Sequence, residues 1–354
     1  MMPSGQASPS FEQLRDQLAL LVVPDGEARQ LIWVIPERLG AAAAAGGAYE
    51  IFILGTPLVA ASAIVAGNML HDRWEPSGGG QSFEASRVLL GAADHFAAVA
   101  ALIATELARL DLSSDEEVQC SFAQVEPIIE LAIRRATLSN EAVLGLIAEL
   151  HVLRVVLLAA TPKARATTLV GWRGWAPGRD FVLGGNAVEV KATVGGMSRH
   201  AFSGVHQLEA QDMGEGKKET LHLLSIGLQP VVSGGPSLPE LIDDLLTLLS
   251  DCDDGGAAHA QLLEMIASYG GADAPSYDHL SMRGWSVYQQ RYAITFARLY
   301  DVEDPEMRLL DRGLVEQTFV VPDSVRFEVL LPSQLSAYNP AENWQQELAA
   351  MARG

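Results

Sequence analysis

The sequence has little cysteine and a shortage of basic side chains. Its 354 residues include two cysteines, Cys120 and Cys252, which are too few and too far apart for a disulfide framework or a cysteine-ligated zinc site. A reducing cytoplasm is therefore the expected setting. Lysine and arginine total 24 against 44 aspartates and glutamates, a formal net charge of -20. Because nucleic acid is densely negative, this imbalance argues against a free-standing, tight DNA binder.

Several catalytic motifs are missing as well. Three glycines at 78–80 are followed by Gln and Ser, so the Gly-Lys-Ser or Gly-Lys-Thr end of a phosphate-cradling loop is absent. The stretch 266–270 lacks the first glycine of a nucleophile elbow. The eight histidines show no paired spacing for zinc. These absences argue against nucleotide hydrolases, serine hydrolases and histidine-ligated zinc enzymes of those types.

The twenty residues from Ile51 to Leu70 carry no charge, and this stretch is long enough to cross a bilayer. It contains glycine and proline, however, and is rich in alanine rather than leucine. This composition indicates a strand over 49–54 followed by a small-residue helix that packs in a core. No membrane partner is expected.

The pattern of apolar runs predicts an α/β protein with two domains. Residues 1–115 are expected to form an accessory α/β domain, and the acidic run 111–117 marks its end. The second domain is expected to span 116–354. The predicted strands are 30–36, 49–54, 82–90, 220–228, 292–299, 315–321 and 325–331. The predicted helices are 92–110, 122–136, 140–158, one capped by Ser237 and Glu240, 257–268 and 344–350.

Residues 179–191 are the most informative stretch and predict a β-hairpin. Short runs with apolar residues at alternate positions flank 184–186, Gly-Gly-Asn, which tolerate the positive φ of a tight turn. If the loop has two or four residues, antiparallel pairing puts Asp180 opposite Glu189 or Lys191, and all three side chains share one face. A three-residue loop would send Asp180 to the other face.

Two carboxylates and an ammonium group on one face have the chemistry of a site for a hard metal ion. Carboxylate oxygens are ligands that Mg²⁺ or Mn²⁺ accepts. A neighbouring lysine can hold the attacking water or stabilise the developing negative charge. The alternative is that these side chains form an ordinary solvated face of a hairpin.

Two further residues favour a site. Glu149 lies within the apolar stripe of the helix predicted over 140–158, and a carboxylate among leucines is costly unless it is paired or bound to a cation. Its alternative role is that of a partly buried glutamate that reaches solvent along its stem. Residues 198–209 predict a strand or a strand-to-helix turn that delivers Gln207 near the same end of the sheet. The Gln207 amide can position water or phosphate, or it can be an ordinary surface amide.

This order of elements resembles the PD-(D/E)XK phosphodiesterase superfamily, which has the restriction-endonuclease-like fold. The order is a helix with Glu149, a strand with Asp180, a strand with Glu189-Val190-Lys191, and then Gln207. The segments 145–150, Gly-Leu-Ile-Ala-Glu-Leu, and 171–175, Gly-Trp-Arg-Gly-Trp, are similar to those of bacterial PD-(D/E)XK motif proteins, which are often linked to phage-defence gene clusters. The resemblance is specific over about 145–208.

The resemblance implies an α/β, restriction-endonuclease-like core, a mixed central sheet flanked by helices. It implies Asp180 and Glu189 as ligands of Mg²⁺ or Mn²⁺, with Glu149 as an accessory acid at the metal. Lys191 would polarise water or the phosphate, and Gln207 completes the predicted catalytic set. One position departs from the family pattern, because Arg179 rather than proline precedes Asp180. That proline is not a ligand, so the departure leaves the predicted chemistry intact.

Basic side chains are concentrated around the predicted site. Residues 131–200 hold nine basic and four acidic side chains, although the whole chain is strongly acidic. A phosphodiester substrate requires such a bias, whereas the acidic remainder suggests a protein partner with a basic surface. The expected partners are therefore DNA and the proteins of a restriction or phage-defence complex, with a homodimer as a further option.

The expected function is metal-dependent endonucleolytic hydrolysis of DNA. The alternative keeps the fold but not the reaction: the chain is a catalytically inactive structural or interaction subunit, and Glu149, Asp180 and Lys191 form a buried ion-pair network. A close cluster of ligands would favour the enzyme. A salt bridge of Lys191 that fills the site would favour the subunit.

Overall fold

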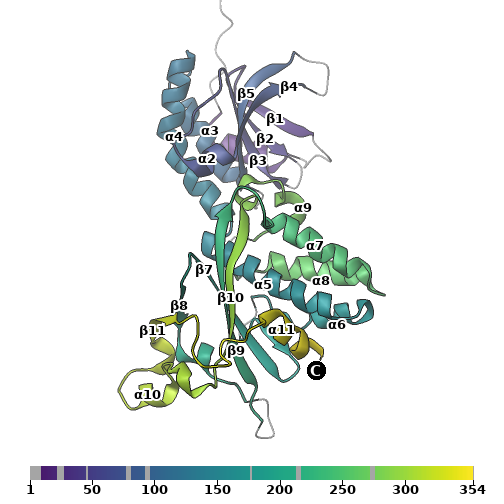
Figure 1. Ribbon diagram of the computed structural model, residues 1–354. Helices are drawn as coiled ribbons and strands as arrows, with labels where there is room; N and C mark the ends of the chain where they lie inside the picture. The colour runs from purple at the N-terminus through teal and green to yellow at the C-terminus, as the bar shows by residue number, and fades with distance from the viewer. Residues whose placement is uncertain are drawn as a thin grey trace, which may run out of the picture. The chain divides into compact units, whose positions relative to one another are not determined.

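A computed structural model describes residues 9–21, 28–44, 47–76, 81–91, 96–175, 178–212, 217–271 and 276–353 (Figure 1). The glycines at 78–80 and the first residues, 92–95, of one predicted helix lie outside these ranges. The chain divides into two compact units. The first comprises Met1–Leu138 with Leu280–Val287, and the second comprises Ser139–His279 with Tyr288–Gly354.

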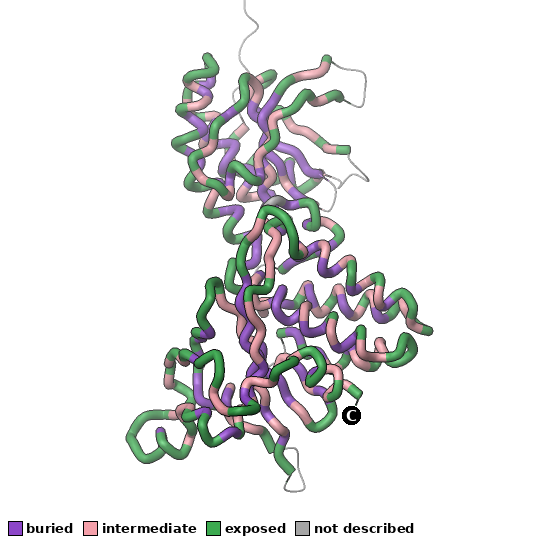
Figure 2. Tube along the Cα trace, in the orientation of Figure 1, coloured by how far each residue is buried: buried purple, intermediate pink, exposed green. Residues whose placement is uncertain are grey.

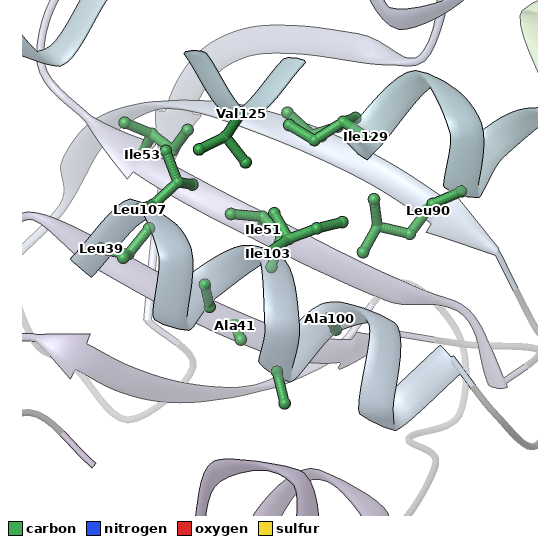
Figure 3. Close-up of a cluster of buried hydrophobic side chains, with 14 of the residues drawn as sticks. Leu39, Ala41, Ile51, Ile53, Leu90, Ala100, Ile103, Leu107, Val125 and Ile129 are labelled. Carbon is green, nitrogen blue, oxygen red and sulfur yellow. The ribbon is translucent and has the colours of Figure 1, made fainter. Parts of the chain in front are cut away.

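The first unit contains an antiparallel five-stranded sheet with helices on one face. The strand order is β1-β2-β3-β5-β4, with β1 at Arg29–Ile35, β2 at Leu39–Ala44, β3 at Tyr49–Leu54, β4 at Met69–Trp74 and β5 at Phe83–Gly91. The helices are α1 (Phe11–Ala19), α2 (Ala63–Gly67), α3 (Phe96–Ala108) and α4 (Asp115–Ala136). Figure 3 shows how α3 and α4 pack apolar side chains against the strands.

The helix α4 explains why the first unit ends after Leu138 rather than at the predicted boundary of 115. Its residues Phe122 and Ile129 are fully buried, and they share a core with Ile51 and Ile53 of β3. Without α4, this side of the sheet core would be exposed to water. The acidic run therefore lies inside the first unit, where Ser114 caps the helix by accepting a hydrogen bond from Glu117 N.

Two strands of the first sheet are absent from the sequence prediction. The strand β2 is a run of Leu, Gly and four alanines that is buried on both faces. Alanine has a low intrinsic preference for strands, so the neighbouring strands β1 and β3 impose this conformation. The uncharged stretch 51–70 supplies β3, the short helix α2 and the start of β4, the second strand missed.

The second unit is built around a mixed four-stranded sheet, as predicted. The strand order is β10-β9-β7-β6, with β6 at Phe181–Leu183, β7 at Asn186–Val194, β9 at Thr220–Val231 and β10 at Arg291–Asp301. The β7–β9 pair is parallel, and the other two pairs are antiparallel. The interior strand β9 is buried at seven of its twelve residues, and β7 is buried over 187–190 (Figure 2).

Helices cover this sheet. The central one is α5 (Asn140–Ala159), which contacts both β7 and β9. Around it lie α6 (Arg165–Leu169), α7 (Leu238–Ser250), α8 (Gly255–Ala267) and α11 (Trp344–Arg353), and a short helix α9 (His279–Met282) follows α8 in the chain. The predicted α/β core, a mixed sheet flanked by helices, is therefore confirmed.

The remaining strands form a small antiparallel pair, β8 (Ser198–Ser203) with β11 (Arg326–Leu331). The strand predicted over 315–321 is wrong. Asp311 caps a short helix, α10 (Arg312–Glu316), by accepting a hydrogen bond from Leu314 N at 2.8 Å. The apolar residues at 319–321 then lie exposed in the connection that follows, so their pattern does not reflect burial in a sheet.

Among the residues that the structure describes, one helical stretch, Asp115–Ala159, is long and apolar enough to cross a membrane by length and composition alone, because it contains an 18-residue window with a mean hydropathy of 2.1. It comprises α4 and α5, and 56% of its apolar window is buried within the protein. Core helices of compact domains have the same character.

Replacement of Phe122 by alanine tests the assignment of α4 to the first unit. Phe122 is 0% exposed, so Phe122→Ala should lower the free energy of unfolding of this unit by about 3–5 kcal/mol. Leu131→Ala is the matched control, because Leu131 lies on the same helix and is 56% exposed; its effect should stay within about 0.5 kcal/mol. Denaturant unfolding followed by circular dichroism measures both, and equal effects would contradict the assignment.

Candidate active site

The hairpin β6–β7 has the two-residue loop. Phe181 pairs with Val188 and Leu183 pairs with Asn186, so Gly184 and Gly185 form the turn. Gly184 has a φ of +63°, which residues with a side chain rarely adopt. The register places Asp180, just before β6, opposite Glu189. Asp180, Glu189 and Lys191 consequently share one face of the sheet.

Asp180 and Glu189 lie close enough to influence each other electrostatically. Asp180 Oδ2 accepts a hydrogen bond from Val190 N at 2.6 Å. Burial, and then the nearby Glu189 carboxylate, raise the pKa of Asp180 to about 7, against the opposing effects of the Val190 N–H and Lys191. Glu189 is 4% exposed, and its Oε1 lies 2.8 Å from Lys191 Nζ.

Glu149 joins the same group from the helix α5. It is 5% exposed, its Oε2 accepts a hydrogen bond from Trp172 Nε1 at 2.7 Å, and its Oε1 accepts one from the Tyr269 hydroxyl at 2.5 Å. Burial, and then the charge of Asp180, raise the pKa of Glu149 well above its usual value, while the two hydrogen bonds oppose this shift. Glu149 is therefore buried and paired with donors rather than reaching solvent.

The local sequence explains how α5 presents Glu149. Ser139 caps the helix by accepting a hydrogen bond from Ala142 N at 3.2 Å. Gly145 precedes Glu149 by four residues and so lies on the same helix face. A Cβ at Gly145 would lie 2.9 Å from the Tyr269 hydroxyl oxygen, so only glycine leaves room for the hydroxyl that reaches Glu149.

Trp172 comes from a short segment that pairs with β6. Arg173 N donates to the Asp180 carbonyl at 2.8 Å, and Val182 N donates to the Gly171 carbonyl at 2.8 Å. These bonds hold the indole beside Glu149, and Trp172 is 1% exposed. Trp172 is therefore part of the core of the second unit. Its role as a hydrogen-bond donor to Glu149 was not anticipated.

Lys191 is flanked by a buried polar cluster on the neighbouring strands. Its Nζ lies 5.2 Å from the centre of the Phe202 ring, and its register partner on β9 is Ser225. The Ser225 hydroxyl lies 2.7 Å from His200 Nε2. Burial, and then the charge of Lys191, lower the pKa of His200 to about 4. His200 is therefore neutral near pH 7, and Lys191 is the cation on this side of the carboxylates.

Gln207 takes a local role in the structure. It lies in a single 3₁₀ turn, Val205–Leu208, and its Oε1 accepts a hydrogen bond from Ser203 N at 3.4 Å. Across the described residues, no hydrogen bond joins its amide to Glu149, Asp180, Glu189 or Lys191. The structure thus brings four of the five predicted residues together, and a catalytic role for Gln207 stays a prediction.

Arg179, the residue in the place of the family's proline, anchors this region. Its side chain is 2% exposed, and Nε donates to Glu219 Oε1 at 2.7 Å. The same guanidinium donates to the carbonyl of Gln207 at 3.0 Å and to that of Glu209. Arg179 therefore ties the start of β6 to the 3₁₀ turn and to Glu219, which directly precedes β9. In the sequence, the only signal was a pair of opposite charges beside two predicted strands.

The side chains present fit a divalent metal ion. Glu149, Asp180 and Glu189 offer carboxylate oxygens, the ligands that Mg²⁺ and Mn²⁺ prefer. Burial, and then their mutual repulsion, raise the pKa of Asp180 and Glu149, and a cation would relieve the repulsion. Within the described ranges, no three His, Cys, Asp or Glu side chains are already arranged around one ion position. Binding would therefore require these carboxylates to adjust.

Asp180 should make the stability of the protein depend on pH. Its pKa is about 7 in the folded state and 3.8 in the reference state, so the folded protein holds a proton that the unfolded chain has lost between these values. Stability should therefore fall as pH rises from about 4 to 7. As pH rises from 5 to 8, wild type should lose about 2 kcal/mol of unfolding free energy that Asp180→Asn keeps.

Denaturant unfolding at several pH values in the presence of a chelator measures this difference. Glu264→Gln is the control, because Glu264 is exposed on α8 of the same unit. A pH dependence that is the same in wild type and Asp180→Asn would show that Asp180 does not hold the proton.

Loss of Arg179 should destabilise the second unit. Arg179→Met leaves Glu219, whose side chain is 9% exposed, without its cation, and removal of one partner of a buried pair costs about 3–5 kcal/mol. The double variant Arg179→Met with Glu219→Gln should recover part of this loss, because no buried charge then remains unpaired. Unfolding free energies of the single and double variants test this, and an equal loss in both would argue against the pair.

Comparison with models of protein families matches residues 96–304 to the family described as "Putative PD-(D/E)XK family member, (DUF4420)". The match covers more than half of the chain and includes all five predicted site residues. No curated protein and no solved structure matches the chain. The resemblance seen in the sequence is thereby confirmed, and the chain belongs to this family of the PD-(D/E)XK superfamily.

Proposed function

We propose that the chain is a metal-dependent endonuclease that hydrolyses phosphodiester bonds in DNA, as a component of a bacterial restriction or phage-defence system. The observation that carries the proposal is the hairpin register, which sets Asp180 opposite Glu189 and puts Lys191 on the same face. Membership of a nuclease-like family supports it. Glu149, hydrogen-bonded from two sides, adds a third carboxyl group to this arrangement.

Each residue has a defined role in this proposal. Asp180 and Glu189, with Glu149 beside them, would hold Mg²⁺ or Mn²⁺. When bound, such an ion activates water and neutralises charge that develops on the phosphate. Lys191 would orient the attacking water from the edge of the carboxylate group. Gln207 would turn its amide away from Ser203 to position water or phosphate.

The charge distribution supports a DNA substrate and a protein partner together. Residues 131–200, the stretch of sequence that contains the four assembled side chains, hold nine basic and four acidic residues, although the chain carries a net charge of -20. An acidic protein binds DNA weakly by itself, because it releases few counterions from the phosphates. A partner with a basic surface, in the cytoplasm, would hold both the DNA and this chain.

Two observations favour a second candidate function, a catalytically inactive subunit with the same fold. Lys191 Nζ already forms an ion pair with Glu189 Oε1 at 2.8 Å, and both oxygens of Glu149 already accept hydrogen bonds. A group of acids satisfied in this way can serve as a structural network. In that case the acidic surface would dock a partner, and no bond would be cleaved.

Cleavage of supercoiled and linear DNA by the purified full chain, with Mg²⁺ or Mn²⁺, tests the enzyme. Asp180→Asn and Lys191→Met should each lower the rate of cleavage by about 100-fold or more, because each removes a group placed at the reaction. Lys163→Met is the matched control, since Lys163 is exposed and lies in the same basic stretch. Its rate should equal that of wild type.

A second measurement separates an inactive fold from an enzyme that lacks its partner. Mn²⁺ should raise the Tm of wild type and not that of Asp180→Asn, because an ion that binds only the folded state stabilises it. Cleavage with the expected pattern supports the nuclease. The absence of both cleavage and stabilisation by Mn²⁺ would support the inactive subunit.

A further inference from the structure

The first unit contains a pocket that the nuclease proposal does not use. It has a volume of about 720 Å³ and lies on the face of the five-stranded sheet opposite α3 and α4. Strand alternation separates the two faces: Ile51 and Ile53 of β3 pack under the helices, whereas Phe52 points to the pocket. Volumes of this size are typical of ligand sites.

Aromatic rings from four strands form the floor and walls of this pocket. Phe52 is 2% exposed and lies at the floor, with T-shaped contacts to Trp74 at 5.0 Å and to Phe83 at 6.4 Å between ring centres. Phe83 in turn contacts Trp33 at 5.4 Å, and Trp33 is 37% exposed. Such rings attract cations to their faces.

One cation already uses this property inside the pocket. The guanidinium of Arg29 lies 4.9 Å from the centre of the Trp74 ring. Glu50, 1% exposed, neutralises it through an Nε to Oε2 contact of 2.6 Å and also pairs with Arg87 at 2.8 Å. The single carboxylate of Glu50 thus faces two guanidinium groups, which leaves one surplus positive charge, and the position of Arg29 shows that the rings accept a guanidinium.

Two further carboxylates at the pocket lining outweigh this single surplus charge. Glu37 and Glu75 are exposed, and neither takes part in an ion pair with the residues that the structure describes. Glu37 has a φ of +56°, a backbone conformation that costs free energy for a residue with a long side chain. The whole segment 1–138 carries seventeen acidic and eight basic side chains, so its potential is negative.

We propose that this pocket binds a basic side chain, an arginine or lysine, of a protein partner. The aromatic rings would hold the cation and its aliphatic stem, while Glu37 and Glu75 supply the opposite charge. The volume exceeds that of one guanidinium group, and Leu31 and Leu54 line the rest of it, which suits apolar neighbours of the basic residue. A nucleobase would also stack on these rings, but its phosphates would then face two unbalanced carboxylates.

Isothermal titration of the full chain with two short peptides tests the proposal. One is the acetylated amide Leu-Arg-Leu, and the other carries citrulline, the neutral isostere of arginine, in its centre. The arginine peptide should bind about tenfold or more tightly than the citrulline peptide. Glu37→Gln and Glu75→Gln should each weaken binding of the arginine peptide several-fold and leave the citrulline peptide unchanged.

Glu116→Gln is the matched control, because Glu116 is an exposed acid on α4, which packs on the opposite face. It should leave both affinities unchanged. Equal affinity for the two peptides, or no binding of either, would overturn the proposal. Agmatine that binds as tightly as the arginine peptide would overturn the protein source of the cation, and a thymidine decanucleotide that competes for the pocket would replace it with a nucleobase. None of these outcomes depends on nuclease activity.

Discussion

A two-residue turn at Gly184–Gly185 decides which side chains of the second unit meet. Because side chains alternate between the faces of a strand, this turn puts Asp180 across from Glu189 and on the face of Lys191. The neighbouring Arg179 points to the other side, where it meets Glu219. A slip of one residue would take Arg179 away from Glu219 and leave that buried carboxylate without its cation. The buried ion pair of Arg179 therefore disfavours the wrong register.

The carboxyl groups of the site are buried and repel one another, and the surrounding side chains offset this cost only in part. Burial and mutual repulsion both favour the protonated forms of Glu149 and Asp180. The Trp172 indole and the Tyr269 hydroxyl stabilise the charge on Glu149, and Lys191 does the same for Glu189. These contacts offset part of the cost of burying the acids and of their mutual repulsion.

Much of this site was predictable from the sequence, because periodicity carries the relevant information over short distances. Side chains alternate along a strand, so the spacing of Asp180, Glu189 and Lys191 places all three on one face once the loop length is known. The sequence left that length open. Glu149 stood out because its apolar neighbours share its helix face. Tyr269, by contrast, is separated from Glu149 by 120 residues, and no local pattern links them.

The errors in the predicted fold have physical causes of the same kind. Alanine-rich β2 has no preference for a strand, and its partners on either side supply the missing information. The helix α4 follows an acidic run that looks like a linker, yet its buried face joins it to the first sheet. The apolar run 319–321 has residues typical of a strand, although its side chains are exposed. In each case tertiary contacts outweighed local propensity.

Gly145 shows how a residue without functional groups can govern the chemistry of another. Its missing side chain admits the Tyr269 hydroxyl, whose hydrogen bond lowers the proton affinity of Glu149. A single methyl group at Gly145 would therefore displace this hydroxyl and make Glu149 a stronger base, although no residue with a functional group had been replaced. Related chains that carry a larger residue here would need a different donor for this acid, or would have to keep it protonated.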